Sequence, residues 1–187
     1  ADGEEENVLR AVQTIVEEKL AHPILIGRPS VIESRIERMA LWIRPGQHFE
    51  VTNIDSDPRF NEYAKHYHAK MERRGVSPAG AKAVLRSRSA VIAAVMVDRG
   101  EADALICGVV GRYEGKLQHV LDVIGLEPGI ERPAALSAIA SDKGVHFFTD
   151  TYVNYEPSAE TLACATIQAA RRLKIFGIRP KIALLSH

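Results

Sequence analysis

The sequence predicts an α/β fold with three layers, in which helices cover both faces of a mostly parallel sheet. Three features support this prediction. Segments with helical periodicity alternate along the chain with short apolar segments. Glycines follow several of the predicted strands and helices, as expected at tight connections. A stretch rich in proline and glycine at residues 127–133 divides the chain. We therefore expect a first domain at residues 1–132 and the start of a second at residues 133–187.

The first elements follow from simple patterns. Apolar residues repeat at helical spacing within residues 4–20 and predict an amphipathic helix. The apolar segment 24–26 predicts a buried strand that ends at a glycine. Ser30 and Glu33 fit a capping box and predict the start of a second helix.

The remaining elements continue the alternation. We expect further helices at residues 57–74, 77–88, 89–99, 117–124 and 158–176. We expect further strands at residues 49–54, 102–107, 134–140, 145–148 and 181–185. The turn at residues 142–144 predicts a hairpin between two of these strands. The chain ends directly after a predicted strand, where an α/β unit normally continues, so we expect the second domain to be only partly present.

Composition excludes several classes of partner. The chain has 187 residues, 24 of them Lys or Arg and 24 Asp or Glu, which gives a formal net charge of zero. Nucleic-acid binders usually carry a basic excess, so we expect no nucleic-acid partner. No apolar run is long enough to span a bilayer, and we expect no membrane partner. Two cysteines do not make a disulfide framework, and a reducing, cytoplasmic location is expected.

The segment after the predicted strand at 102–107 is a candidate anion site. Gly108, Gly111, Arg112 and Lys116 lie in a turn that leads into a helix. Backbone N–H groups at a helix N-terminus bind anions, and glycines allow a phosphate to come close. A tight turn with two solvated cations is the alternative. The spacing fits neither the P-loop nor the dinucleotide-binding fingerprint.

Other side chains are also considered for a site. Asp150 and Thr151 follow a predicted strand and could contact a ligand at the sheet edge, or could simply organise a loop. His66 and His68 are two apart on a predicted helix and do not share a face, so we expect no metal site. Cys107 is expected to be a small buried side chain.

Longer motifs resemble a known family. Residues 147–163 resemble the segment F-x-D-T-x-V-N-x-x-P-(T/S)-A-E-x-L-A of the phosphate acetyl/butyryl transferases, and residues 100–104 resemble their G-x-A-D-G. The likeness runs through nearly the whole chain in order. It implies a phosphotransacetylase-like fold, related to the isocitrate and isopropylmalate dehydrogenases, with an active site in the cleft between two α/β/α domains.

The resemblance also shows departures from the transferases. Met71 stands where the family has an arginine, and Gln118–His119 stand where it has an Arg-Pro pair. The serine, arginine and aspartate that the family uses for catalysis in its last part have no counterpart here. Each charge-assisted hydrogen bond to a phosphate contributes on the order of 1.5–3 kcal/mol. We therefore expect no catalytic residues and no acetyl transfer by this chain.

A second likeness suggests a role. The pattern at residues 108–113, with the segment 184–187, is similar to the transferase-like C-terminal part of NADP-dependent malic enzymes. That resemblance implies a regulatory and oligomerising module that senses acetyl-CoA, in a parent that decarboxylates malate to pyruvate. NADP and a divalent Mg or Mn ion are then expected only in the parent's catalytic part.

These resemblances imply a tentative effector cleft and a homo-oligomer. The residues expected in the cleft are Arg112, Tyr113, Lys116, Asp150, Thr151 and Ser186. Two alternatives stay open: part of an active phosphate acetyltransferase, which makes acetyl phosphate and CoA, and a purely structural dimerisation domain without a ligand.

Overall fold

The computed structural model describes residues 1–185. They form two compact units, one at Ala1–Gly125 and one from Leu126 onward, so the division lies just before the Pro- and Gly-rich stretch. Each unit is described by itself. Within residues 1–185, none of the helices is both long and apolar enough to cross a membrane.

The first unit is built on a pair of parallel strands. Strand β1 (Ile24–Ile26) pairs with β2 (Glu50–Thr52), with Ile24 opposite Glu50 and Ile26 opposite Thr52. Both strands fall within ranges predicted from the sequence. Leu25 and Ile26 of β1 are buried, as expected for a strand covered on both faces, and the buried residue of β2 is the polar Thr52.

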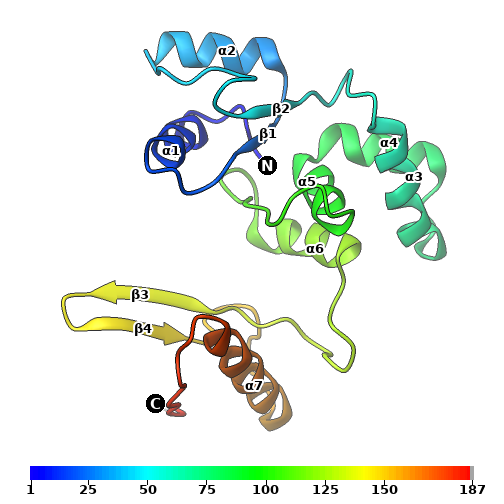
Figure 1. The fold of residues 1–187 in the computed structure, drawn as a ribbon. Helices are drawn as coiled ribbons and strands as arrows, with labels where there is room; N and C mark the ends of the chain where they lie inside the picture. The colour runs from blue at the N-terminus through cyan, green and yellow to red at the C-terminus, as the bar shows by residue number, and fades with distance from the viewer. Residues whose placement is uncertain (186–187) are drawn as a thin grey trace. The chain divides into compact units, whose positions relative to one another are not determined.

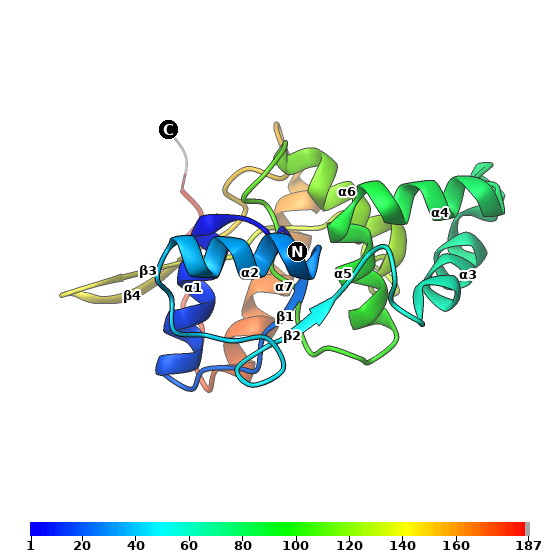
Figure 2. The same ribbon diagram turned by 90° about the horizontal axis from the view of Figure 1, so that it is seen from above.

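Helices cover both faces of this pair, which confirms the three-layer prediction for this unit (Figures 1 and 2). Leu25 packs with α1 (Glu6–Glu17) and α2 (Pro29–Arg38) in one apolar cluster. Ile26 belongs to a second cluster formed with the later helices. Successive side chains of a strand point to opposite faces, so neighbouring residues of β1 serve the two helical layers.

Four helices make up the second layer. They are α3 (Phe60–Met71), α4 (Pro78–Ser87), α5 (Ser89–Asp98) and α6 (Tyr113–Val123). A short 3₁₀ turn, η1 (Glu72–Arg74), follows α3 and ends at Gly75, whose φ of 84° suits glycine. The hydroxyl of Ser77 caps α4 by accepting from the N–H of Gly80 at 3.1 Å. Residues 90–96 of α5 are all buried, so this helix forms the centre of the layer.

The second unit contains a hairpin and one long helix. Strands β3 (Ser137–Ser141) and β4 (Gly144–Phe148) pair antiparallel, with Ser141 opposite Gly144, which confirms the predicted hairpin. Helix α7 (Ala159–Ile175) begins after Ser158, whose hydroxyl accepts from the N–H of Thr161 at 3.2 Å. Ala165, Ala169 and Leu173 form the buried stripe of α7, at the spacing of one helical face.

Three local predictions are wrong. Helix α2 begins at Pro29, so Ser30 and Glu33 form no capping box, and the residue before the helix is Arg28. Residues 102–107 form no strand, and Ile106 is 78% exposed. Residues 181–185 also form no strand, and Leu185 is 86% exposed. A strand needs a neighbouring strand to pair with, and within residues 1–185 no strand pairs with either segment.

Candidate functional site

The N-terminal ends of α5 and α6 flank a pocket in the first unit. The pocket has a volume of about 400 Å³, within the range of small-molecule sites. Arg88 and Ser89 supply one wall at the start of α5, and Arg112 and Lys116 supply another at the start of α6. Unbonded N–H groups and the helix dipole make each helix start electropositive. The pocket therefore combines two helix N-termini with several basic side chains.

The basic side chains of α6 share one face. Arg112 precedes the helix, and Lys116 and His119 follow at spacings of four and three residues, so all three line the pocket. Within residues 1–185, neither Arg88 nor Arg112 forms an ion pair with a carboxylate. Two lining residues thus carry guanidinium groups that no carboxylate within residues 1–185 binds directly, which favours an anion there.

Asp2 supplies the acidic side chain of the pocket. Its carboxylate accepts from the Lys116 ammonium at 2.9 Å and from the Ser89 hydroxyl at 3.2 Å. The N–H of Gly108 donates to the same carboxylate at 3.3 Å. Burial would raise the pKa of Asp2, but the bonds from Lys116, Gly108 and Ser89 outweigh it and hold the pKa below its usual value.

Gln118 and His119, which replace the Arg-Pro pair of the transferases, have different surroundings. The Gln118 amide donates to Asp122 at 2.7 Å, whereas His119 lines the pocket. Burial, together with the nearby charge of Arg88, lowers the pKa of His119. The imidazole is therefore mostly neutral at pH 7 and can gain a positive charge in acid.

Glycines shape the mouth of the pocket. Gly108 and Gly111 have φ angles of 116° and 91°, a region that other residues rarely adopt. Gly115 lies within α6 and lines the pocket, and a Cβ added there would meet no atom within 4 Å. The pocket therefore has an open side at Gly115 that a larger side chain could fill.

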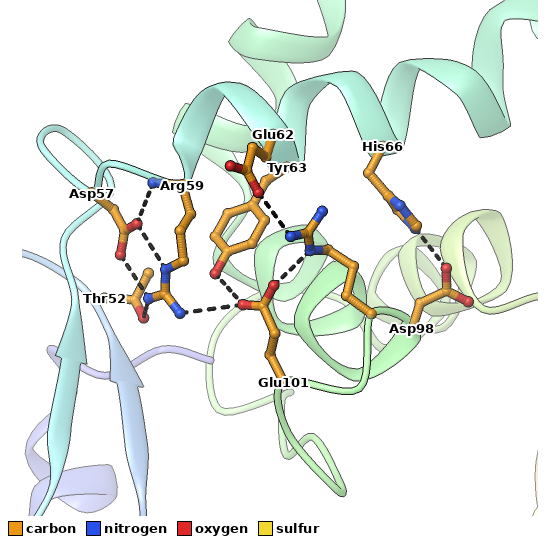
Figure 3. A network of polar contacts seen from close by, with 9 residues as sticks. Thr52, Asp57, Arg59, Glu62, Tyr63, His66, Asp98 and Glu101 are labelled. Atoms are coloured by element: carbon orange, nitrogen blue, oxygen red, sulfur yellow. Dashed lines mark hydrogen bonds and ion pairs between the residues drawn. The ribbon is translucent and has the colours of Figure 1, made fainter.

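A second polar cluster lies where β2 runs into α3 (Figure 3). Arg59 binds Asp57 at 2.9 Å and Glu101 at 3.2 Å, and Glu101 also accepts from Tyr63 at 2.6 Å. Burial and the bond to Glu101 raise the pKa of Tyr63. Arg99 completes the cluster by binding Glu101 at 2.6 Å. Each of these charged groups already has an opposite charge beside it, so the cluster joins elements of the fold and leaves no group free for a ligand.

The histidines of α3 form no metal site. His66 bonds to Asp98 at 2.6 Å (Figure 3), and Lys70 binds the same carboxylate at 2.6 Å. Among residues 1–185, no group of three or more His, Cys, Asp or Glu side chains is placed to hold a metal ion. The pair therefore anchors α3 to the end of α5.

Asp150 and Thr151 belong to the second unit and have local partners. The Asp150 carboxylate accepts from the N–H groups of Ala135 at 2.9 Å and Asn154 at 2.8 Å. Backbone and side-chain donors thus hold the pKa of Asp150 low, although burial alone would raise it. The Thr151 hydroxyl lies 3.3 Å from that of Ser137. These bonds hold the loop before α7, and ligand contact by Asp150 and Thr151 stays a prediction.

The structure brings only some of the six residues predicted for an effector cleft into the pocket. Arg112 and Lys116 line the pocket of the first unit, and Tyr113 is the half-exposed first residue of α6. Asp150 and Thr151 lie in the second unit, and Ser186 lies outside the described residues. That the six form one cleft stays a prediction.

Comparison with known proteins identifies the family of this chain. The family described as Phosphate acetyl/butaryl transferase matches residues 1–187. The chain belongs to this family.

Relatives from this family include two kinds of enzyme. An NAD-dependent malic enzyme of Rhizobium meliloti is 50% identical over 187 residues, and an NADP-dependent malic enzyme of Escherichia coli is 50% identical over 186. A phosphate acetyltransferase of Nitratidesulfovibrio vulgaris is 28% identical over 186 residues. The chain is covered completely in each case, but it spans only 24%, 24% and 26% of these relatives. These two malic enzymes are therefore more similar to this chain than this phosphate acetyltransferase is.

Solved phosphotransacetylases share the fold. One from Streptococcus pyogenes matches 99% of this chain with a TM-score of 0.86 and 24% identity, over 55% of its own length. The EutD phosphotransacetylase from Staphylococcus aureus matches 96% with a TM-score of 0.85 and 21% identity, over 53% of its length. These likenesses confirm the α/β phosphotransacetylase fold.

Sequence reasoning missed several residues of the pocket, among them Asp2, Arg88 and Ser89. Asp2 is far from Lys116 in sequence, and no local pattern links them. Arg88 and Ser89 were read only as the boundary of a helix, although a boundary residue is well placed to meet a ligand. For His119, the signal in the sequence is its helical spacing from Arg112 and Lys116, which places it on the same face of α6.

Proposed function

We propose that the chain is a regulatory and oligomerising domain of a malic enzyme, that its pocket binds acetyl-CoA or a related acyl-CoA, and that it does not transfer acetyl groups. Two malic enzymes match the whole of this chain at 50% identity, against 28% for a phosphate acetyltransferase. This difference supports a malic enzyme as the parent protein. In the parent, malate would be oxidatively decarboxylated to pyruvate by a different part of the protein.

The pocket supports the binding of an acyl-CoA. Coenzyme A carries several phosphate groups, and the two unpaired guanidinium groups of Arg88 and Arg112 suit such anions. The two helix N-termini add favourable dipoles and N–H donors. This unpaired pair of arginines is the observation on which the binding proposal mainly rests.

Two positions support the absence of acetyl transfer, because the transferases have arginine there and this chain does not. Met71 is 7% exposed and belongs to the apolar core of the first unit. Gln118 is neutral and bonds to Asp122. Neither position offers a guanidinium group to a transferring phosphate, so we expect the site to retain binding without the electrostatic stabilisation that phosphate chemistry needs.

The remaining expectations concern the parent protein. NAD or NADP and a divalent Mg or Mn ion would be bound by its catalytic part. The two malic enzymes at 50% identity carry different coenzymes in their names, so the match supports neither coenzyme over the other. Cys107 and Cys164 are both free thiols, which suits a cytoplasmic location. A homo-oligomer is proposed from the family likeness alone.

The effector role is tested on the whole protein that carries this domain. Malate oxidation is measured with and without acetyl-CoA, and in parallel with the variant Arg88→Gln/Arg112→Gln. We expect acetyl-CoA to change the rate of the unsubstituted protein and to have a much weaker effect on the variant. An unchanged rate in the unsubstituted protein would favour the purely structural dimerisation domain.

An active phosphate acetyltransferase is the second candidate, favoured by the family match and the solved phosphotransacetylases. A coupled assay on the whole protein that carries this domain decides between the two functions. It follows the formation of acetyl phosphate and CoA from acetyl-CoA and phosphate. We expect no turnover above background. Robust turnover would reject the regulatory proposal.

A further inference from the structure

The Asp2 carboxylate lies where an anionic ligand of the pocket would be expected. It accepts from the Lys116 ammonium at 2.9 Å, the Ser89 hydroxyl at 3.2 Å and the Gly108 N–H at 3.3 Å. Its side chain is only 7% exposed. An ammonium, a hydroxyl and a backbone N–H beside a glycine are the donors that proteins commonly offer to phosphate groups. The protein's own carboxylate therefore occupies an anion cradle.

The segment around Asp2 is fixed at the backbone. The Gly3 N–H donates to the carbonyl of Ile26 at 3.2 Å, and a Cβ on Gly3 would come within 2.9 Å of that oxygen. The Asp2 N–H bonds to the Ser89 hydroxyl at 3.2 Å. Rotation about the side-chain bonds of Asp2 would move its carboxylate away from Lys116 without moving the strand.

We infer that Asp2 is an internal competitor of the pocket, which a phosphate group of the ligand must displace from Lys116, Ser89 and Gly108. This inference deepens the proposed function, because it concerns the same pocket. Arg88 and Arg112 attract the incoming phosphate, while Asp2 reduces the positive charge that it meets. Asp2 thus lowers the affinity for anions and keeps the cradle closed when no ligand is bound.

Inorganic phosphate tests the inference without involving acyl groups. It is titrated by calorimetry into the 187-residue chain and into Asp2→Asn, which keeps the size of the side chain and an acceptor oxygen but removes the charge. We expect Asp2→Asn to bind phosphate about tenfold more tightly, as expected for removing one charge a few ångströms from the ligand. Asp103→Asn is the matched control, because Asp103 is exposed and forms no ion pair within residues 1–185.

Three results would overturn the inference. They are an equal or weaker affinity in Asp2→Asn, no phosphate binding in either protein, and an equal gain in the control. A second measurement needs no substitution: the carboxyl carbon of Asp2 is followed by NMR as phosphate is added to the unsubstituted chain. The resonance should move as the bond to Lys116 is replaced. A resonance that stays in place would also contradict displacement.

A parallel titration with CoA and acetyl-CoA separates this inference from the proposed function. If phosphate binds more tightly to Asp2→Asn but neither CoA nor acetyl-CoA binds to either protein, Asp2 is an internal competitor and the acyl-CoA proposal fails. If acetyl-CoA binds both proteins equally and phosphate affinity is unchanged, the acyl-CoA proposal survives and the competitor role of Asp2 is rejected.

Discussion

The hydroxyl of Tyr63 donates a 2.6 Å hydrogen bond to the carboxylate of Glu101, which joins α3 to the loop that follows α5. The ring of Tyr63 also lies against two guanidinium groups, at 5.5 Å from Arg59 and 5.6 Å from Arg99. The arginines both bind Glu101, so a single carboxylate connects three side chains (Figure 3). This arrangement holds the layer of helices to the end of β2.

Removing the Tyr63 hydroxyl should weaken the first unit. Tyr63→Phe keeps the ring but removes the bond to Glu101, and we expect a loss of about 1 kcal/mol in the free energy of unfolding. Glu101→Ala should cost more, about 1–3 kcal/mol, because it also leaves the buried hydroxyl without this acceptor. Urea unfolding measures both. Stabilities within error of the unsubstituted chain would show that the cluster does not hold the fold.

The Glu4–Arg28 pair makes stability depend on pH. Two bonds from the Arg28 side chain and one from its N–H lower the pKa of Glu4 to about 2, from an ordinary value of 4.5. The unfolded chain takes up a proton at this group at higher pH than the folded chain. The contribution of Glu4 is therefore complete above about 4.5 and is lost as the pH falls toward about 2.

The unfolding of Glu4→Gln checks this pH dependence. Thermal unfolding is followed across the acid range for the unsubstituted chain, for Glu4→Gln and for Glu33→Gln, an exposed glutamate without an ion pair within residues 1–185. We expect a shallower loss of stability in acid for Glu4→Gln alone. Identical slopes in the three proteins would mean that Glu4 is not the group responsible.

The unpaired arginines of the pocket should determine its affinity for acyl-CoA. We expect Arg88→Gln and Arg112→Gln each to weaken binding about tenfold or more, since a charge-assisted hydrogen bond contributes about 1.5–3 kcal/mol. Arg10→Gln is the control, because Arg10 is exposed on α1 and away from the pocket. An equal loss in the control would indicate a general charge effect instead of a local site.

Gly115 offers a way to fill the pocket without disturbing the core. We expect Gly115→Leu to abolish acetyl-CoA binding while the chain remains folded, because the new side chain meets open space beside the pocket. Gly115→Ala should instead stabilise α6 by about 0.5–1 kcal/mol and largely keep binding. Calorimetry and thermal unfolding measure the two effects. Full binding by Gly115→Leu would place the ligand elsewhere.

Patterns within the sequence predicted the local elements of this fold well. The parallel pair β1–β2 and the hairpin β3–β4 both follow from short-range signals. The prediction of a strand at residues 102–107 is wrong because apolar composition cannot show whether a neighbouring strand is present to pair with it. The prediction of a capping box at Ser30 is wrong because the helix begins one residue earlier, at Pro29, and proline is favoured at the first position of a helix.

The pocket was harder to predict than the elements around it. Arg112 and Lys116 were identified because they follow a glycine turn, which is a local signal. Asp2 and Arg88 were missed because they reach the pocket only through the packing of α5 against β1 and α6. Asp150 follows a strand as a ligand-binding residue often does, but no sequence pattern indicates its bonds to the N–H groups of Ala135 and Asn154, which hold the loop before α7.

The central claim is that this domain binds acyl-CoA in the pocket between α5 and α6. Calorimetric titration of acetyl-CoA into the 187-residue chain, beside Arg88→Gln/Arg112→Gln, tests it most directly. We predict measurable heat with one site per chain and a loss of binding in the variant. No heat and no thermal shift at millimolar acetyl-CoA, or equal binding by the variant, would contradict the claim.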